Sequence, residues 1–354
     1  KPEGSLVGLS SAGYSSTTSA DRLTLTVDWG DGTIEPGILL PTVGTDAGTI
    51  SNTHVYADNG TYTVTLTLGD GGTTVSSESH VSVTNVTPAV GTVNGPTTVV
   101  RGQTVAYSLP FTDAGSADTH TAVIGWGDGT SSVGTVSELN GVGSVSGSHR
   151  YATNGNYTIQ VTVTDDDGGA RSASQAISVV TAALVANPVD PTKNDLVVGG
   201  TTGDDSIAFA AGTGGIKVTF GGVVLGTFAV TGRIVVDGDA GNDTIALAST
   251  LTLPAVLTGG AGNDALTGGA GADQLVGGEG NDTLTGNGGN DTLSGDAGND
   301  SLVGGAGNDA YLFDTDDALG SDTLNEAGGG FDTLDFSATT GSAIHIDLGM
   351  DAAQ

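Results

Sequence analysis

Residues 259–312 repeat one nine-residue phrase six times without a gap: GGAGNDALT, GGAGADQLV, GGEGNDTLT, GNGGNDTLS, GDAGNDSLV and GGAGNDAYL. The shared pattern is G-G-x-G-x-D-x-U-x, in which U is a large apolar residue. Glycine at positions one, two and four permits left-handed backbone angles, so each phrase is predicted to begin with a tight turn. Positions seven to nine favour a short β-strand. The block therefore predicts stacked short strands separated by glycine-rich turns.

Two phrases are expected to make one coil, so each turn should stack on the turn eighteen residues later. The position-six aspartates then form two columns, Asp264, Asp282 and Asp300 in one and Asp273, Asp291 and Asp309 in the other. The apolar side chains point inward: Leu266, Leu275, Leu284, Leu293, Leu302 and Tyr311. Because stacked strands lie about 4.8 Å apart, neighbouring carboxylates repel by roughly 3 kcal/mol at an effective dielectric constant of about 20.

The countercharge for these columns must come from solution, because no lysine or arginine follows Arg233. Carboxylates and turn carbonyls are hard oxygen ligands, and they suit Ca²⁺, which takes about six to eight of them in flexible geometry. The sequence therefore predicts several bound calcium ions. The alternative is a flexible glycine-rich linker, but a linker has no reason to place an apolar residue at the eighth position of every phrase.

The block resembles the RTX (hemolysin-type) repeats, which form a calcium-binding parallel β-roll. The resemblance implies that each ion lies between two stacked turns and takes the position-six aspartate of both. The four implied pairs are Asp264 with Asp282, Asp282 with Asp300, Asp273 with Asp291, and Asp291 with Asp309. Backbone carbonyl ligands would come from the turns that begin at Gly259, Gly268, Gly277, Gly286, Gly295 and Gly304.

The repeat departs from its pattern at three places and degenerates at both ends. Asn287 and Asp296 replace a second glycine and Ala272 replaces the usual asparagine, which is expected to distort turns without removing an aspartate. Upstream, GTTGDDSI from Gly200 and GDAGNDTI from Gly238 offer Asp205 and Asp243, and the sheet is expected to continue through residues 216–236 in wider coils. Whether Asp205 and Asp243 bind calcium is left open. Downstream, Phe313, the run Asp314–Asp317 and AGGGFDTLDF from Ala327 predict the end of the roll, with Asp332 either holding another ion or forming a polar edge.

A second internal repeat lies in the first half of the chain. DWGDGT from Asp28 and HVYADNGTYTVTLTLGDGG from His54 recur as GWGDGT from Gly125 and HRYATNGNYTIQVTVTDDDGG from His149, 95 to 97 residues later. Both copies contain alternating runs rich in Val and Thr, which predict strands. They resemble the PKD domain, an immunoglobulin-like β-sandwich, through W-G-D-G-T followed by H-x-Y-x-x-x-G-x-Y.

The resemblance suggests structural roles for most of the motif residues. Trp29 and Trp126 are expected in the cores, and His54 and His149 are expected to be hydrogen-bonding residues in preference to metal ligands. The acids Asp113, Asp118 and Asp165–Asp167, and Asp70 in the first copy, are predicted to be solvated turn residues in preference to an edge or interdomain calcium site.

The fold class is therefore all-β, with two PKD-like sandwiches followed by a calcium-binding parallel β-roll. The expected domains are residues 1–85 (a sandwich that lacks its N-terminal lead-in), 86–181 (a second sandwich), 182–198 (a linker), 199–258 (degenerate repeats), 259–312 (the repeat block) and 313–354 (its C-terminal flank). Because the first copy lacks the lead-in and residue 1 is a lysine, we expect a piece of a longer or processed protein.

Composition limits the partners. The 40 acidic and 8 basic residues leave a formal charge of −32, a field that repels nucleic acid and anionic membranes and attracts divalent cations. There is no cysteine for a disulfide or a thiolate zinc site. No run of eighteen apolar residues predicts a membrane span, and no signal peptide is recognised. Calcium sites of weak affinity fill only at millimolar calcium, which indicates a location outside the cell.

No catalytic motif is recognised, and the five histidines are scattered, so we expect no enzyme. The leading interpretation is a non-catalytic extracellular segment of a large modular bacterial surface or secreted protein, an adhesin or spacer whose roll folds on meeting calcium. The RTX resemblance implies type I secretion. One alternative is a subunit of a calcium-dependent filament, surface layer or matrix, and another is the accessory region of a secreted hydrolase. Expected partners besides calcium are other copies of the chain or ligands of the cell surface or matrix.

Overall fold

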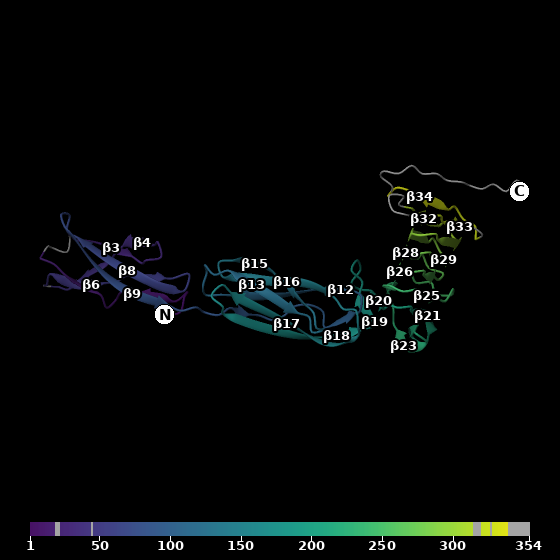
Figure 1. Ribbon diagram of the computed structural model, residues 1–354, viewed down its shortest axis with the longest axis horizontal. Helices are drawn as coiled ribbons and strands as arrows, with labels where there is room; N and C mark the ends of the chain where they lie inside the picture. Colours follow the sequence, from purple (N-terminus) through teal and green to yellow (C-terminus); the bar gives the residue numbers. More distant parts are fainter. Residues whose placement is uncertain (18–21, 44, 314–319, 326–327, 339–354) are drawn as a thin grey trace, which may run out of the picture. The chain divides into compact units, whose positions relative to one another are not determined.

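The structure is a computed structural model that describes residues 1–17, 22–43, 45–313, 320–325 and 328–338 (Figure 1). Every extended regular element in these residues is a β-strand. The chain divides into two compact units, and each is described by itself. The first comprises Lys1–Pro96, Ala106–His149 and Tyr157–Ala176, and the second comprises Thr97–Val105, Arg150–Asn156 and Ile177–Gln354.

The first sandwich is built from three antiparallel sheets. Their strand orders are β4-β3-β8-β9, β2-β6-β5 and β1-β7. The strands are β1 (Leu6–Gly8), β2 (Gly13–Ser15), β3 (Thr24–Asp28), β4 (Ile34–Pro36), β5 (Leu39–Pro41), β6 (Ala47–Ile50), β7 (Thr53–Val55), β8 (Gly60–Gly69) and β9 (Thr74–Val83). Alternation in β3 buries Leu25 and Val27 against Trp29 and Tyr56, as expected for a sheet with one face on the core.

The second sandwich has two sheets, with orders β10-β12-β16-β15 and β11-β18-β17-β13-β14. The strands are β10 (Ala89–Val90), β11 (Thr98–Val100), β12 (Thr104–Thr112), β13 (His120–Gly125), β14 (Ser131–Val133), β15 (Thr135–Leu139), β16 (Val142–Arg150), β17 (Gly155–Asp165) and β18 (Ala170–Val180). Strand β13 alternates buried and exposed residues along its length. Trp126 directly follows it and is almost fully buried, so the predicted core role of this residue is confirmed.

The WGDGT motif and the histidine that follows it form one structural unit in each sandwich. In the first, the ring of His54 stacks on Trp29 with centroids 5.0 Å apart, and His54 Nε2 lies 2.6 Å from Asp31 Oδ2. The second copy repeats both contacts, at 4.9 Å for Trp126 with His149 and 2.7 Å for His149 Nε2 with Asp128 Oδ2. These histidines hold the turn against the core, which is the structural role expected for them.

The roll consists of two eight-stranded sheets, and successive strands of the repeat block alternate between them. One sheet contains β19 (Ala182–Ala186), β20 (Asn194–Gly199), β24 (Ile234–Asp237), β26 (Ala255–Ala261), β28 (Gln274–Glu279), β30 (Thr292–Ala297), β32 (Ala310–Leu312) and β34 (Thr333–Asp335), in that order. The other contains β23 (Val223–Phe228), β22 (Gly215–Phe220), β21 (Ser206–Gly212), β25 (Thr244–Leu247), β27 (Ala265–Thr267), β29 (Thr283–Gly288), β31 (Ser301–Ala306) and β33 (Thr323–Leu324), in that order.

Strand register confirms the predicted coil of two phrases. Leu266 of β27 is the partner of Leu284 in β29, and Leu284 is the partner of Leu302 in β31, so the parallel register advances eighteen residues per coil. The upstream copies belong to the same stack: Ile207 of β21 pairs with Ile245 of β25, which pairs with Leu266. The β22–β23 hairpin occupies the extra length of the first coil, which agrees with the expected wider coils.

Residues 182–198, for which the sequence predicts a linker, form β19, a loop and most of β20. The two strands pair antiparallel from Ala182 with Val198 to Ala186 with Asn194, and β20 continues in parallel to β24. Within the loop, Asn187 accepts from the backbone N–H groups of Val189 and Asp190 through its side-chain oxygen. This segment is therefore a hairpin that begins the first sheet of the roll.

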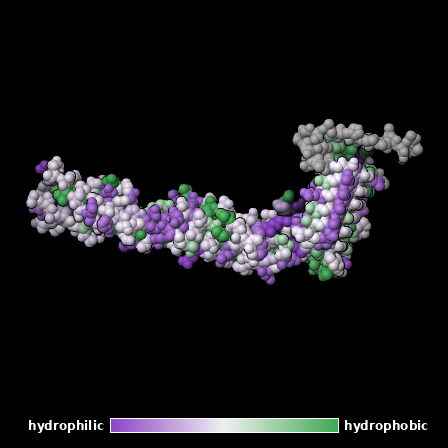
Figure 2. All heavy atoms as spheres, in the orientation of Figure 1, coloured by the Kyte–Doolittle hydropathy of each residue, from purple (hydrophilic) through white to green (hydrophobic). Residues whose placement is uncertain are grey.

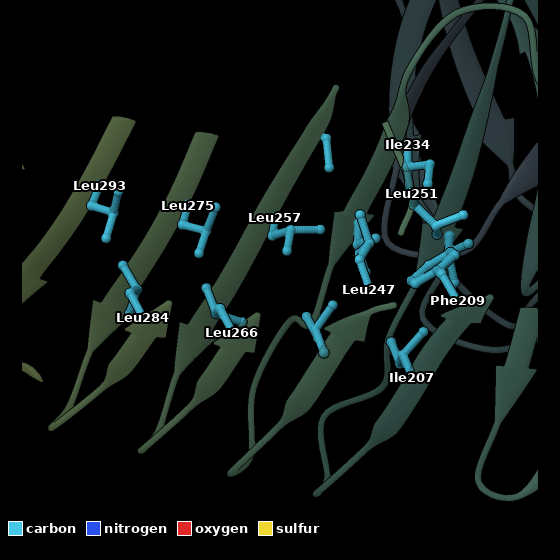
Figure 3. Close-up of a cluster of buried hydrophobic side chains, with 14 of the residues drawn as sticks. Ile207, Phe209, Ile234, Leu247, Leu251, Leu257, Leu266, Leu275, Leu284 and Leu293 are labelled. Carbon is cyan, nitrogen blue, oxygen red and sulfur yellow. The ribbon is translucent and has the colours of Figure 1, made fainter. Parts of the chain in front are cut away.

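The core of the roll is a ladder of apolar side chains between the two sheets (Figure 3). Leu257, Leu275 and Leu293 come from one sheet, and Leu266 and Leu284 come from the other and point toward them. The predicted inward residues Leu266, Leu275, Leu284, Leu293, Leu302 and Tyr311 are all between 0% and 1% exposed. Each buried leucine contributes about 1.5–3 kcal/mol of transfer free energy, so the repeated apolar position supplies the core of every coil.

The roll continues past the repeat block in the described residues. Strand β33 pairs in parallel with β31, and β34 pairs in parallel with β32. The ring of Phe313 stacks on Phe336 with centroids 5.2 Å apart. The acidic run Asp314–Asp317 lies outside the described residues. Among the residues that the structure describes, no helix is long and apolar enough to cross a membrane.

Candidate calcium sites of the roll

In four of the six turns of the block, those that begin at Gly259, Gly268, Gly277 and Gly286, the opening glycine leaves room for a carboxylate oxygen and a carbonyl oxygen. A methyl group built on Gly259 would lie 2.2 Å from Asp264 Oδ2 and 2.7 Å from the carbonyl oxygen of Gly277. At Gly277 the corresponding distances are 2.2 Å to Asp282 Oδ2 and 2.8 Å to Gly295 O. The carboxylate of one turn and the opening carbonyl of the turn one coil later therefore face the same small space, which only glycine leaves open.

The other carboxylate oxygen of each aspartate fixes its direction. Asp282 Oδ1 accepts a hydrogen bond from the backbone N–H of Asp264 (2.7 Å), and Asp300 Oδ1 accepts from Asp282 N–H (2.8 Å). In the opposite column Asp291 Oδ1 accepts from Asp273 N–H and Asp309 Oδ1 accepts from Asp291 N–H, both at 2.8 Å. The two predicted columns are therefore present, and the aspartates of each predicted pair are neighbours in them.

Six of the position-six Oδ2 atoms have no hydrogen-bond partner among the residues that the structure describes. They are buried and unpaired in Asp243, Asp264, Asp282, Asp291, Asp300 and Asp309, and these residues are only 1–3% exposed. No lysine or arginine of the described residues forms an ion pair with any of them. An uncompensated buried carboxylate costs several kcal/mol, roughly, so a cation is required if these groups are ionised.

Burial perturbs the acidity of the columns in the expected direction. Desolvation, together with the smaller effect of the neighbouring aspartate charges, raises the pKa of Asp243 to about 7, that of Asp282 to about 6 and that of Asp291 to about 7. Desolvation also raises the pKa values of Asp264, Asp273 and Asp300. In the absence of metal, the folded columns therefore favour protons.

Asp273 differs from the other aspartates of the block. Its Oδ2 accepts a hydrogen bond from Gly269 N–H at 2.7 Å, and its Oδ1 accepts from Ala255 N–H, also at 2.7 Å. The glycines of this turn approach Leu251 and Leu253, which belong to a segment without the repeat pattern. Asp273 is thus the first residue of its column, and its carboxylate is already partly satisfied by the backbone.

The substituted turns keep their shape. Asn287 and Asp296 adopt φ values of 71° and 62°, so both accept the left-handed conformation for which the pattern uses glycine. Asn287 Nδ2 also donates to the carbonyl oxygen of Gly268 at 2.8 Å. The expected distortion is therefore absent at these two positions. Among the described residues, Gly268 is the one opening glycine of the block whose carbonyl oxygen accepts a hydrogen bond from a side chain.

A second ladder was not anticipated from the sequence. The position-five asparagines stack one coil apart: Asn281 N–H donates to Asn263 Oδ1 at 2.7 Å, and Asn299 N–H donates to Asn281 Oδ1 at 2.9 Å. In the aspartate ladder each backbone N–H donates to the side chain of the following coil, whereas in the asparagine ladder it donates to the side chain of the preceding coil. Neighbouring residues five and six of one turn therefore bind the coils on both sides. Ala272 interrupts the asparagine ladder in the other column. Figure 2 shows a hydrophilic stripe along the roll, as stacking of identical polar turns requires.

Both columns extend beyond the block. Asp205 N–H donates to Asp243 Oδ1 and Asp243 N–H donates to Asp264 Oδ1, so the degenerate copies join the first column. The Asp205 carboxylate instead accepts from Thr201 N–H of its own turn. Downstream, Asp322 Oδ1 and Asp332 Oδ1 accept from Asp300 N–H and Asp309 N–H, both at 3.0 Å. Asp322 was missed in the sequence, although GSDTL from Gly320 shares G-x-D-T-L with GFDTL from Gly330.

The donor set fits calcium. Each turn offers hard oxygens only, a buried carboxylate and backbone carbonyls, and flexible oxygen-only cages of this type suit Ca²⁺ better than Mg²⁺, which demands near-octahedral geometry. Bound calcium would supply positive charge between stacked turns and so allow the carboxylates to remain ionised. The ligand sets of individual ions, including any at Asp205, Asp243 and Asp332, stay predictions.

Comparison with known families agrees with this geometry. Residues 7–84 and 85–180 match the PKD domain, and residues 235–247, 256–284 and 276–311 match the RTX calcium-binding nonapeptide repeat in four copies. A comparison with curated proteins gives no match. Similar solved structures include the PKD domain of an M14-like peptidase from Thermoplasmatales archaeon SCGC AB-540-F20 (24% identity, 26% of this chain and 92% of that chain, TM-score 0.23). Another is an I-band fragment of titin (14% identity, 62% of this chain and 71% of that chain, TM-score 0.25).

The fold and its turns define a modular, calcium-binding all-β protein. More specifically, the chain carries two PKD domains followed by RTX calcium-binding nonapeptide repeats. These are non-catalytic modules, and the repeats bind Ca²⁺.

Proposed function

We propose that this chain is an extracellular segment of a large modular bacterial surface or secreted protein. In this proposal the sandwiches act as spacers or adhesive units, the chain performs no catalysis, and the roll folds when it meets external calcium. The observation that supports it best is the set of buried, unpaired Oδ2 atoms in a roll without a single lysine or arginine after Arg233.

Coupling of folding to calcium follows from the electrostatics of the columns. Without metal, each coil must either protonate its aspartates or bury charges next to one another, and both are unfavourable near neutral pH. The glycine-rich repeats then cannot offset the entropy of ordering, so they should remain disordered. Because the binding site exists only in the folded coil, the free energy of calcium binding is also free energy of folding.

An extracellular location is supported by the same chemistry. Calcium sites of weak affinity fill only where calcium is millimolar, and PKD domains and RTX repeats typify extracellular bacterial proteins. A chain that stays unfolded at low internal calcium is suited to passage through a secretion channel, and type I secretion is the route that the repeats suggest. Ligands of the cell surface or matrix are then the partners for the sandwiches.

The test is circular dichroism combined with size-exclusion chromatography and light scattering, on the full chain in EDTA and then in millimolar calcium. We expect calcium to increase the β signal and reduce the hydrodynamic radius while the mass remains that of a monomer. If calcium instead produced large ordered assemblies, the result would favour a subunit of a filament or surface layer over a spacer or adhesin. An unchanged signal and radius would overturn calcium-induced folding.

A further inference from the structure

A second group of carboxylates lies in the first unit, well separated in sequence from the roll. It comprises Glu3, Asp58, Asp113, Asp118 and Asp167, here called the junction cluster. Glu3 and Asp58 belong to the first sandwich, and the other three belong to the second. The sequence predicts Asp113, Asp118 and Asp167 to be solvated turn residues, but Asp118 is only 7% exposed and Glu3 only 2%.

Close backbone contacts bring the two sides of the cluster together. Ala117 N–H donates to the carbonyl oxygen of Ala57 at 3.1 Å. Gly4 adopts a φ of 67°, and a side chain there would approach Ala114 O to 2.7 Å, so the chain next to Glu3 tolerates only glycine. The turn 113–118 of the second sandwich therefore packs directly on residues 4 and 57 of the first.

Three of the four oxygen atoms of the buried Glu3 and Asp118 carboxylates lack a partner among the described residues; the fourth, Glu3 Oε1, accepts from Val86 N–H. Both oxygens of Asp118 and Oε2 of Glu3 are buried without a hydrogen bond. The Asp118 carboxylate lies over Gly115, where a methyl group would come within 2.3 Å of Oδ2. No lysine or arginine of the described residues pairs with any member. Within the described part of the chain, Asp113 is the one member with a basic neighbour: its Oδ2 lies 3.1 Å from His120 Nε2, and Nδ1 of the same ring lies 2.6 Å from Glu138 Oε2.

The oxygen positions are compatible with shared coordination. Glu3, Asp113 and Asp118 each offer a carboxylate oxygen, and these three atoms lie within 4.8 Å of one another. The same limit holds for Asp58, Asp118 and Asp167, of which the first and last are exposed. Two oxygens that bind one calcium ion at about 2.3–2.6 Å are at most about 5 Å apart. Asp118 belongs to both triads and is the centre of the cluster.

Electrostatics support the same conclusion. Desolvation, together with the smaller effect of the neighbouring acidic charges, raises the pKa of Asp118 to about 7; these charges belong to Glu3, Asp113, Asp166 and Asp58. Desolvation also raises the pKa of Glu3. Several acids gathered around a buried carboxylate are unfavourable unless a cation joins them.

We propose that the junction cluster is a calcium site between the two sandwiches, with Asp118 as its central ligand. Glu3 and Asp113 provide ligands on the buried side of the site, and Asp58 and Asp167 provide ligands on its solvent side. Carboxylate oxygens at this spacing are the donors that Ca²⁺ accepts in irregular geometry. An ion bound there holds the turn 113–118 against the first sandwich, so calcium stiffens the junction as well as folding the roll. The site is independent of the proposed function of the roll.

Hydrogen–deuterium exchange with mass spectrometry on the full chain tests the site, because it reads the junction and the roll separately. We expect millimolar calcium to slow exchange in peptides covering residues 113–119, by about tenfold when calcium is ten times its dissociation constant. Peptides from the turn between β8 and β9, which holds no member of the cluster, should not change. If the 113–119 peptides exchange equally with and without calcium while roll peptides respond, the junction site is wrong and the roll proposal stands. If neither region responds, both are wrong.

Variants complete the test. Asp118→Asn should abolish the calcium effect on residues 113–119 and leave the roll peptides responsive. Glu78→Gln, which removes an exposed charge from β9 outside the cluster, should behave as wild type. Should Asp118→Asn lose the native fluorescence of Trp29 and Trp126, the exposed ligand variant Asp167→Asn replaces it and is expected to weaken the calcium effect severalfold. Undiminished protection of residues 113–119 in a folded variant would overturn the assignment of the ligands.

Discussion

At the scale of single residues, a buried Oδ2 atom without a hydrogen-bond partner distinguishes the column aspartates, which need calcium, from other acids of the same turns. Asp282→Asn keeps the size of an interior column residue and removes its charge. We expect the calcium concentration at the folding midpoint to rise about tenfold or more, since a lost charge-assisted contact costs roughly 1.5–3 kcal/mol. A calcium titration followed by circular dichroism measures it.

Asp296→Asn is the matched control for that variant. Asp296 lies outside the columns at the second position of its turn, with a φ of 62°, and Asn287 already occupies the equivalent position of the preceding turn with a φ of 71°. Its midpoint should stay within about twofold of wild type, because asparagine tolerates this backbone and no column carboxylate is lost. Equal midpoint shifts in the two variants would indicate that net charge, and not the columns, controls folding.

The raised pKa values of the column predict an unusual response to acid in the calcium-free chain. The pKa values of Asp243 and Asp291 are about 7 in the folded roll and about 4 in the unfolded chain. Between pH 4 and pH 7, approximately, the folded state therefore binds more protons than the unfolded state. Stability without calcium should therefore be greatest at and below the unfolded pKa and be lost as pH rises through 7. Circular dichroism in EDTA should show β signal gained as pH is lowered from about 8 to about 5. A β signal that falls as the pH is lowered over this range would contradict this prediction.

At the scale of the repeat, the interrupted asparagine ladder offers a gain of stability. Ala272 is exposed and occupies position five of its turn. Its methyl group cannot accept a hydrogen bond from the N–H of Asn290 one coil later, whereas Asn263 Oδ1 accepts one from Asn281 N–H. Ala272→Asn should restore one hydrogen bond and stabilise the calcium-bound roll by about 0.5–1.5 kcal/mol. Urea denaturation in saturating calcium measures the change. Ala270→Asn, an exposed position of the same turn without a ladder partner, should give no gain.

The repeat block was largely predictable because its period is strict. Nine-residue spacing alone determines which side chains point inward and which aspartates share a column, and the register of eighteen residues confirms both. Asp322 and the β19–β20 hairpin were not predicted, since they depend on how irregular segments rejoin the sheets. Residues 182–198 are predicted as a linker, but they form a hairpin whose short loop contains Pro188 and Pro191. Asp118 lies in a turn that contacts the first sandwich through Ala117 and Ala57, and a contact so distant in sequence leaves no local signal of its burial.

At the scale of the whole molecule, the two tryptophans separate the behaviour of the sandwiches from that of the roll. Trp29 and Trp126 are buried in the sandwiches, and the chain has no other tryptophan. Removal of calcium at room temperature should leave their emission that of buried indole, because the apolar cores of the sandwiches require no metal. The far-UV signal should fall at the same time, because the roll unfolds.

Thermal unfolding in calcium should accordingly give two transitions, one seen by tryptophan emission and one only by circular dichroism. The roll transition should depend strongly on calcium, since each site that is bound only when folded adds about 2.7 kcal/mol at a hundredfold excess over its dissociation constant. Leu284→Ala, which empties a fully buried position of the roll, should cost about 2–5 kcal/mol and lower only that transition. If tryptophan emission shifted to the red on chelation, or if Leu284→Ala lowered both transitions, the sandwiches would depend on the roll for their stability and the modules would be one cooperative unit.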